Sequence, residues 1–229
     1  MFTPTLIVSL GLGAALLFSW KKWRAAARAE YIRTYPLPHG LFEKLQARHP
    51  QLTAKEYQLV ARALRHYFLA HLKSGRQFVS MPSQVVDDLW HELILHTKED
   101  AMFCNKAFGK FMHHTPAVAM SSAKQSNAGL RRCWWFTCLE ENINPKNATR
   151  LPLLFALDAK LNIPNGFRYT LDCNRIKSDR RNGNDSAVVH CGSDFSNSSF
   201  DGTTDGFGGG SSGDGADGSG CGGGCGGGD

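Results

Sequence analysis

An uncharged apolar segment at the start of the chain constrains its architecture more than any other feature. Residues Phe2 to Trp20 read FTPTLIVSLGLGAALLFSW and contain no Lys, Arg, Asp or Glu. A helix of about 19 residues is about 28 Å long, which is close to the hydrocarbon thickness of a bilayer, about 30 Å. The segment therefore predicts an N-terminal transmembrane helix.

The charges that follow this segment predict its orientation. Lys21, Lys22 and Arg24 come directly after it, and no cationic side chain precedes it. A cleaved signal peptide has its positive charges before a shorter apolar run, whereas a basic flank after the run is typical of an uncleaved anchor with its N-terminus outside. We therefore expect a single-pass cell-membrane protein with a cytoplasmic domain. A cleaved signal peptide and a buried helix are the alternatives.

The other end of the chain has a different composition. From about Ser178, Asn, Ser, Asp and Gly dominate, and every Lys and Arg lies at or before Arg181. Such a segment buries too little apolar surface to offset its ordering entropy, which predicts a disordered Gly-rich tail. Cys221 and Cys225 in this tail are either solvated or available for soft metals, cross-linking or modification. We expect three parts: an anchor with its basic flank (1–24), a helical domain (25–177) and the tail (178–229).

The middle of the chain has helical periodicity. Thr53 and Glu56 have capping-box spacing, apolar residues recur at helical intervals after them, and Gly75 is a typical stop. Further helices are predicted over 83–98, 100–112, 130–141 and 151–161, and the best strand candidate is 166–173. The predicted fold class is mainly α, with a single helical domain. Asp158 and Asp172 are candidates for structural hydrogen-bonding carboxylates.

Cysteine usage and charge distribution restrict the expected partners. The seven cysteines are odd in number and irregularly spaced, which favours reduced thiols in the cytoplasm over a disulfide framework. Trp134 and Trp135, between Cys133 and Cys138, predict core packing, with an interaction face as the alternative. Basic residues do not interleave with aromatic ones as they do in nucleic-acid-binding domains. We expect the lipid bilayer and an unidentified protein as partners, and no nucleic acid.

A short stretch, DDLWHELILHTKEDAMFCNKAFGKFMHHTP from Asp87 to Pro116, holds four of the nine histidines. On a helix at 100° per residue, one arc forms a core stripe, and Asp87 and His91 share a flank where the carboxylate can accept the ring N–H. The stripe consists of Val86, Leu89, Trp90, Leu93 and Thr97. In the next predicted helix Cys104 lies on an aromatic arc, which also contains Phe103, Ala107, Phe108 and Phe111.

Three interpretations of this stretch remain open. The favoured one is two packed helices with a buried thiol. The second is a site for zinc or another transition metal formed by His91 and Cys104 with His96, His113 or His114, although the spacing matches no common zinc signature. The third is a Cys/His nucleophilic pair, which needs an accessible thiol.

The same residues carry a resemblance to a known family. The motif Asp87-Asp88-Leu89-Trp90-His91, followed by Cys104, resembles the glycine-rich domain-containing protein family, in particular its bacterial membrane-anchored members. The resemblance covers residues 41–173 and carries over Asp87, Trp90, His91 and Cys104. The chain departs from the plant pattern at Leu93, which replaces a second His, and it lacks the aromatic residue expected near Asp100. The resemblance implies a helical domain and no established reaction.

Two functions follow as hypotheses. The first is a membrane-anchored, non-enzymatic binding or scaffold module, because no paired catalytic constellation is evident. The second is a metal-dependent or Cys/His enzyme centred on His91 and Cys104. The two differ in whether Asp87, His91 and Cys104 converge in one pocket.

Overall fold

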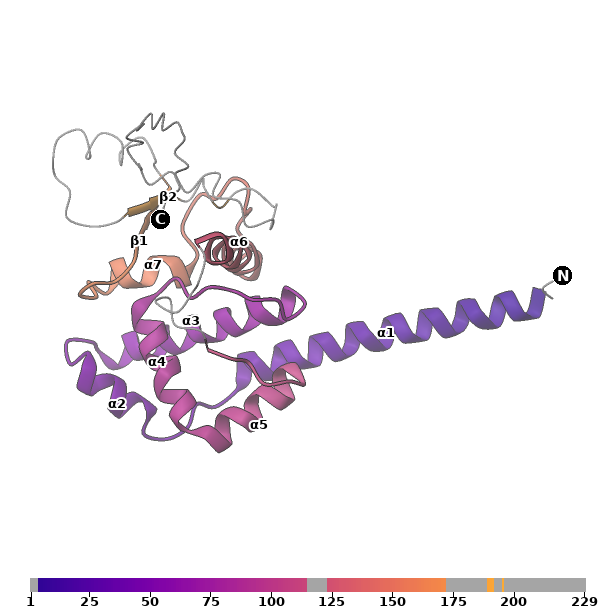
Figure 1. Cartoon of the computed structure of the whole chain (residues 1–229), viewed down its shortest axis with the longest axis horizontal. Helices are drawn as coiled ribbons and strands as arrows, with labels where there is room; N and C mark the ends of the chain where they lie inside the picture. The colour runs from indigo at the N-terminus through magenta and orange to yellow at the C-terminus, as the bar shows by residue number, and fades with distance from the viewer. Residues whose placement is uncertain (1–3, 115–122, 172–188, 192–194, 196–229) are drawn as a thin grey trace, which may run out of the picture.

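The computed structural model describes residues 4–114, 123–171, 189–191 and 195, and only the backbone of 4–10, 123–127 and 189–191. This part of the chain is mainly helical, as predicted, with two short strands (Figure 1). The elements are α1 (Pro4–Thr34), α2 (Leu41–Arg48), α3 (Ala54–Lys73), α4 (Gln84–Leu95), α5 (Thr97–Phe108), α6 (Ala123–Glu140), α7 (Leu153–Lys160), β1 (Arg168–Thr170) and β2 (Val189–Cys191).

Helix α3 is the centre of the domain. Its predicted capping box is confirmed, because the Thr53 side chain accepts from the backbone N–H of Glu56 and the Glu56 carboxylate accepts from that of Thr53. The helix packs against α1, α4, α6 and α7. Val60, Leu64 and Phe68 are at most 2% exposed. Burial of each such side chain contributes about 1.5–3 kcal/mol, so this one helix organises much of the core.

Several predicted helix boundaries differ from those in the structure. The first helix of the motif ends at Leu95, because His96 has a non-helical ψ of 63° and separates α4 from α5. Helix α5 ends at Phe108, where Gly109 adopts a left-handed φ of 75°. Thr97 and Phe111, placed on buried arcs by periodicity, are exposed. Helix α2 was not predicted, and α6 begins earlier than expected.

A two-stranded sheet and one aromatic side chain complete the domain. Strands β1 and β2 pair in parallel, with Tyr169 opposite His190. Phe195 is fully buried and packs against the rings of Trp134 and Phe155. The predicted boundary at residue 178 assigns β2 and Phe195 to the tail, whereas the structure packs them on the helical domain. Residues 196–229, with Cys221 and Cys225, lie outside the described part, as does Asp172.

Helix α1 extends away from the other helices, with the N-terminus at its far end (Figure 1). Its last turns pack on the domain, where Ile32 is fully buried and Arg33 donates from Nε and an Nη to the two carboxylate oxygens of Glu140 at 2.9 and 3.1 Å. Lys73 of α3 binds the same carboxylate.

No helix in the part of the chain described here combines the length and the apolar character needed to cross a membrane. This finding does not confirm the transmembrane helix predicted for residues 2–20. The side chains of that segment up to residue 10 lie outside the described part.

Candidate functional site

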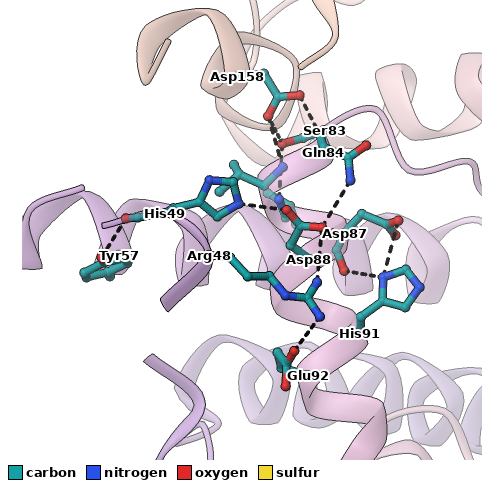
Figure 2. Close-up of polar contacts among 12 residues, drawn as sticks. Arg48, His49, Tyr57, Ser83, Gln84, Asp87, Asp88, His91, Glu92 and Asp158 are labelled. Carbon is teal, nitrogen blue, oxygen red and sulfur yellow. Dashed lines mark hydrogen bonds and ion pairs between the residues drawn. The ribbon is translucent and has the colours of Figure 1, made fainter. Parts of the chain in front are cut away.

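The helix that carries the motif is fixed at its N-terminus by a buried carboxylate. Ser83 is the N-cap of α4, as predicted. Asp158 of α7 accepts from the Ser83 hydroxyl at 2.6 Å and from the backbone N–H groups of Gln84, Val85 and Phe167 at 2.7, 3.3 and 2.9 Å (Figure 2). These four donors satisfy Asp158 and tie α7 to the start of α4.

A second set of polar contacts ties α4 to α2 and the residue after it. The Asp88 carboxylate contacts His49 Nε2 at 2.7 Å and the Arg48 guanidinium at 3.5 Å. Arg48 also contacts Glu92 at 2.8 Å (Figure 2). Lys44 contacts the same carboxylate at 3.5 Å. The acidic groups on this flank of α4 are therefore paired with cations, and the contacts serve packing.

The remaining flank of α4 brings together Asp87, His91 and His114. Nδ1 of His91 lies 2.9 Å from the backbone oxygen of Asp87 and 3.5 Å from its carboxylate oxygen Oδ2 (Figure 2). The other carboxylate oxygen, Oδ1, lies 3.3 Å from Nε2 of His114. Each residue can offer one ligand atom such that all three atoms lie within 4.8 Å of one another. We refer to these three residues as the Asp/His cluster.

Trp90 holds His114 in place. The two rings are stacked, with centroids 4.4 Å apart and planes only 5° from parallel. Trp90 is 3% exposed and packs against Tyr67 and Phe68. The His114 ring also contacts the His91 ring, with a centroid distance of 4.3 Å. A side chain that follows α5 is thus oriented by the core toward a flank of α4.

Three side-chain atoms of the Asp/His cluster are buried without a well-formed hydrogen bond. Oδ1 of Asp87 and both ring nitrogens of His114 are buried without a hydrogen bond. Burial raises the pKa of Asp87, against the opposing effect of His91, and Asp88 adds to the rise. Burial also lowers the pKa of His114, with a further contribution from His91. Both shifts favour the neutral forms, as expected for polar groups enclosed without enough partners.

Cys104, the fourth residue of the predicted motif, lies elsewhere. It is 2% exposed, and its thiol is 3.8 Å from Oδ1 of Asp100. Burial raises the pKa of Cys104 to about 12, so the thiol is protonated at neutral pH. Cys133 and Cys138 are also buried free thiols. None of the contacts described for Cys104 involves His91, which removes the geometric basis for a Cys/His pair.

The other predicted ligands are also separate from the cluster. His96 occupies the junction between α4 and α5. His113 is exposed and packs edge-on against Phe111. Of the five residues proposed as metal ligands from sequence, the structure therefore brings together His91 and His114, and Asp87 takes the place expected for Cys104. The doublet His113-His114 signalled a ligand candidate, but its return to α4 follows from tertiary packing.

The fold and the site define a mainly helical domain that carries a half-buried Asp/His cluster on one flank of α4. The chain matches the UCP032817-like family over residues 27–195, well over half of its length, and it belongs to this family. The family description names no activity. No curated protein and no solved structure matches the chain. These comparisons do not test the resemblance to glycine-rich domain-containing proteins, which stays a prediction.

Proposed function

We propose that the protein is a membrane-anchored binding module whose helical domain holds a divalent transition-metal ion between Asp87, His91 and His114. The observation that carries this proposal is the convergence of one carboxylate and two imidazoles, whose ligand atoms lie within 4.8 Å of one another. Oδ1 of Asp87 and Nε2 of His114 face each other at 3.3 Å without a well-formed hydrogen bond, and Nδ1 of His114 is buried without one. A buried polar group without a partner costs about 1–3 kcal/mol. A bound cation would offset this cost, because it gives the carboxylate and imidazole lone pairs a common acceptor.

The spacing of the ligand atoms fits a small metal ion. Nitrogen and oxygen ligands lie about 2.0–2.2 Å from zinc, and in a tetrahedral arrangement such ligands are about 3.3 Å apart. Oδ1 of Asp87 lies 3.3 Å from Nε2 of His114, which matches this separation. Oδ2 lies 3.5 Å from Nδ1 of His91, and this nitrogen would exchange its hydrogen bond to the Asp87 backbone oxygen for the ion. Two imidazoles and a carboxylate suit zinc, iron and related metals better than calcium or magnesium. The stacking of Trp90 on His114 supplies the support that a ligand ring needs to keep its orientation.

A metal-dependent enzyme is the second candidate. Three protein ligands leave at least one coordination position for water or substrate, which is the arrangement of catalytic rather than structural zinc sites. In this proposal Asp87, His91 and His114 would hold the ion, and the reaction centre would lie on the partly exposed side of His91. Cys104 has no role in it, because its thiol is buried and protonated.

The exposed part of α1 supports the anchor. Its large apolar side chains are at least half exposed, and the sequence that precedes them, from Phe2, contains no charged residue. The exposed side chains are Leu12, Leu16, Leu17, Phe18, Trp20 and Trp23. The cations that follow favour a cytoplasmic domain with the N-terminus outside. This arrangement is also that of the bacterial membrane-anchored proteins that the motif resembles.

The test is the metal content of the full chain, purified in detergent under reducing conditions and measured by elemental mass spectrometry after loading with zinc and dialysis. We expect about one equivalent in the wild type, from the one three-ligand cluster found among the described residues. The content should be lost in His91→Ala and His114→Ala. His91→Ala should have little effect on folding stability, because the His91 side chain is 42% exposed. Zinc should also raise the melting temperature of the wild type and leave that of His114→Ala unchanged.

His113→Ala is the matched control, because it removes the neighbouring imidazole, which is exposed and outside the cluster. Cys104→Ala tests the ligand predicted from sequence. Both variants should retain zinc. Absence of zinc from the wild type, or equal zinc in His114→Ala and His113→Ala, would refute the proposed site.

A further inference from the structure

An open groove of 1460 Å³ lies where α1 meets the ends of α3 and α5. Helix α1 packs against both of these helices, and Figure 1 shows it leaving the domain at this place. Ala25, Ala26 and Ala27 line the groove on the α1 side, and their small side chains leave space between longer ones. The groove is therefore a junction between the proposed anchor and the helical domain.

Three arginines in the groove lack acidic partners. Arg24 and Arg28 come from α1 and Arg76 follows α3, and none of them forms an ion pair with a carboxylate among the described residues. By contrast, Arg33 and Lys73 at the inner end share Glu140. Burial lowers the pKa of Arg28, and the charges of Arg24 and Arg76 lower it further. The three guanidinium groups thus concentrate positive charge in a groove whose acidic lining residue, Glu30, pairs with Arg33.

The backbone holds Arg76 in an unusual conformation. Gly75 and Arg76 have φ angles of 75° and 65°, so a residue other than glycine lies in the left-handed region. A side chain disfavours this region because its Cβ crowds the backbone. The Arg76 guanidinium donates to the backbone oxygen of Phe108 at 2.8 Å, and Arg28 lies against Gly109 at the same helix end. Both arginines therefore meet at the C-terminus of α5.

Two tryptophans line the groove on the side of the apolar segment. Trp20 and Trp23 are 50% and 68% exposed, and the Arg24 guanidinium lies 5.1 Å from the centre of the Trp20 ring. Exposed tryptophans beside cations are typical of the level of lipid headgroups. Leu16 and Leu17 continue the exposed surface on the N-terminal side. The groove is thus continuous with an apolar surface at one end.

We infer that this groove binds the phosphate of an anionic phospholipid headgroup through Arg24, Arg28 and Arg76. Guanidinium groups match phosphate oxygens in geometry and charge, and cations beside a membrane segment attract anionic lipids. The continuity with exposed Trp and Leu side chains favours a lipid over a soluble phosphate, because acyl chains would lie along α1. The inference extends the proposed membrane attachment and is independent of the Asp/His cluster.

The test uses the full chain in detergent, with bound lipids counted by native mass spectrometry after addition of phosphatidylglycerol or phosphatidylcholine. We expect phosphatidylglycerol to be retained in preference. Arg28→Gln and Arg76→Gly should each weaken its binding about five-fold, which corresponds to one cation at an anionic surface. Arg76→Gly is the sharper variant, because glycine prefers the backbone conformation at this position. If Arg76 only shaped the backbone, Arg76→Gly would be at least as stable as the wild type and would bind phosphatidylglycerol equally well.

Arg62→Ala is the matched control, since it removes an exposed arginine from α3 away from the groove. Equal retention of the two lipids, or no effect of Arg28→Gln and Arg76→Gly, would overturn the inference. Glycerol phosphate that binds as tightly as the lipid, with the same dependence on both arginines, would overturn the lipid assignment. Recovery of the chain from the soluble fraction of cells would instead refute the proposed membrane anchor. This outcome distinguishes failure of the anchor from failure of the lipid site.

Discussion

Two carboxylates beside α4 have opposite surroundings. Asp158, which caps the start of the helix, accepts hydrogen bonds from four donors and is 2% exposed. Asp87, one turn into the helix, has an oxygen that is buried without a hydrogen bond, and burial raises its pKa. Figure 2 shows both residues in one view. Two aspartate side chains near the start of α4 thus differ in their hydrogen bonding: Asp158 has a full set of donors, and Asp87 does not.

The difference distinguishes a carboxylate that stabilises the fold from one that the proposed function assigns to a ligand. A buried carboxylate with enough hydrogen-bond donors stabilises the fold. A buried carboxylate without them lowers the stability of the fold, and such a cost is typical of sites where a ligand supplies the missing contacts. Asp158 therefore serves the joining of α4 and α7. In the proposed function Asp87 instead holds a ligand, together with His91 and His114. The following predictions test this division, beginning with the largest expected effect.

Asp158→Ala should destabilise the protein by about 3–4 kcal/mol, because it leaves a hydroxyl and several backbone N–H groups without an acceptor. Asp87→Ala, measured in the presence of a chelator, should cost less than about 1 kcal/mol, since its carboxylate makes only two contacts, with imidazole nitrogens at 3.3 and 3.5 Å. Urea unfolding followed by circular dichroism gives both values. Equal costs for the two substitutions would break the comparison.

Glu141 should contribute stability in the same manner as Asp158. Burial alone would raise its pKa, but hydrogen bonds from His66, Arg150 and the backbone of Leu153 lower it to about 2. Because the folded pKa is depressed, the stabilisation is complete above the unfolded pKa and is lost as pH falls toward 2. We expect a loss of about 2–3 kcal/mol between pH 5 and pH 2.

The check on Glu141 is the pH dependence of urea unfolding in the wild type and in Glu141→Gln. The variant cannot titrate at this position, so its stability should fall less over the same interval. Parallel curves for the two proteins would contradict the assigned role. Glu141 is a suitable comparison because its side chain is only 8% exposed.

Gly166→Ala should destabilise the protein by about 1–3 kcal/mol, because a Cβ there would lie 2.7 Å from Cβ of Asp158. The substitution perturbs the satisfied carboxylate through sterics alone. Gly13→Ala is the control, since a Cβ at that position meets no atom within 4 Å. Thermal unfolding of both variants should show a loss for the first only, and zinc content should be unchanged in both.

Cys104→Ser should have the smallest effect on the site. Its thiol contacts Asp100 and not the Asp/His cluster, so zinc content should equal that of the wild type. With a pKa of about 12, the thiol should react with iodoacetamide only when the protein unfolds. Mass spectrometry of the native and unfolded protein measures this directly. Rapid alkylation of native Cys104 would return the nucleophile hypothesis.

Local signals in the sequence predicted much of this arrangement. The Thr53–Glu56 capping box and the Ser83 N-cap were recognisable because each depends on residues within one turn. Trp90 was correctly placed on the buried stripe for the same reason. The break between the two motif helices was predicted near residue 99 and lies at His96. Its position was missed because no proline or glycine marks it, and α5 packs against both α1 and α4.

The candidate site could be predicted only in part. Asp87 and His91 were paired from their four-residue spacing, which is a property of any helix. The third member, His114, reaches them after the left-handed turn at Gly109 and by stacking on Trp90. Those contacts join segments that are distant in sequence, and the periodicity of a single helix carries no information about them. Cys104 was assigned to the site from the motif, and the burial that removes it depends on neighbours such as Asp100 and Tyr35.

The length and continuity of α1 have a mechanical consequence. Its 31 residues form a rod about 46 Å long, and no glycine or proline interrupts it between Trp20 and Thr34. Arg33 and Lys73 clamp its end to the domain through Glu140. A rod without a hinge transmits its tilt and rotation to whatever it carries. If the first half of α1 is held in a membrane, as proposed, its tilt and rotation therefore determine the distance of the Asp/His cluster from the membrane surface and the direction in which the cluster faces.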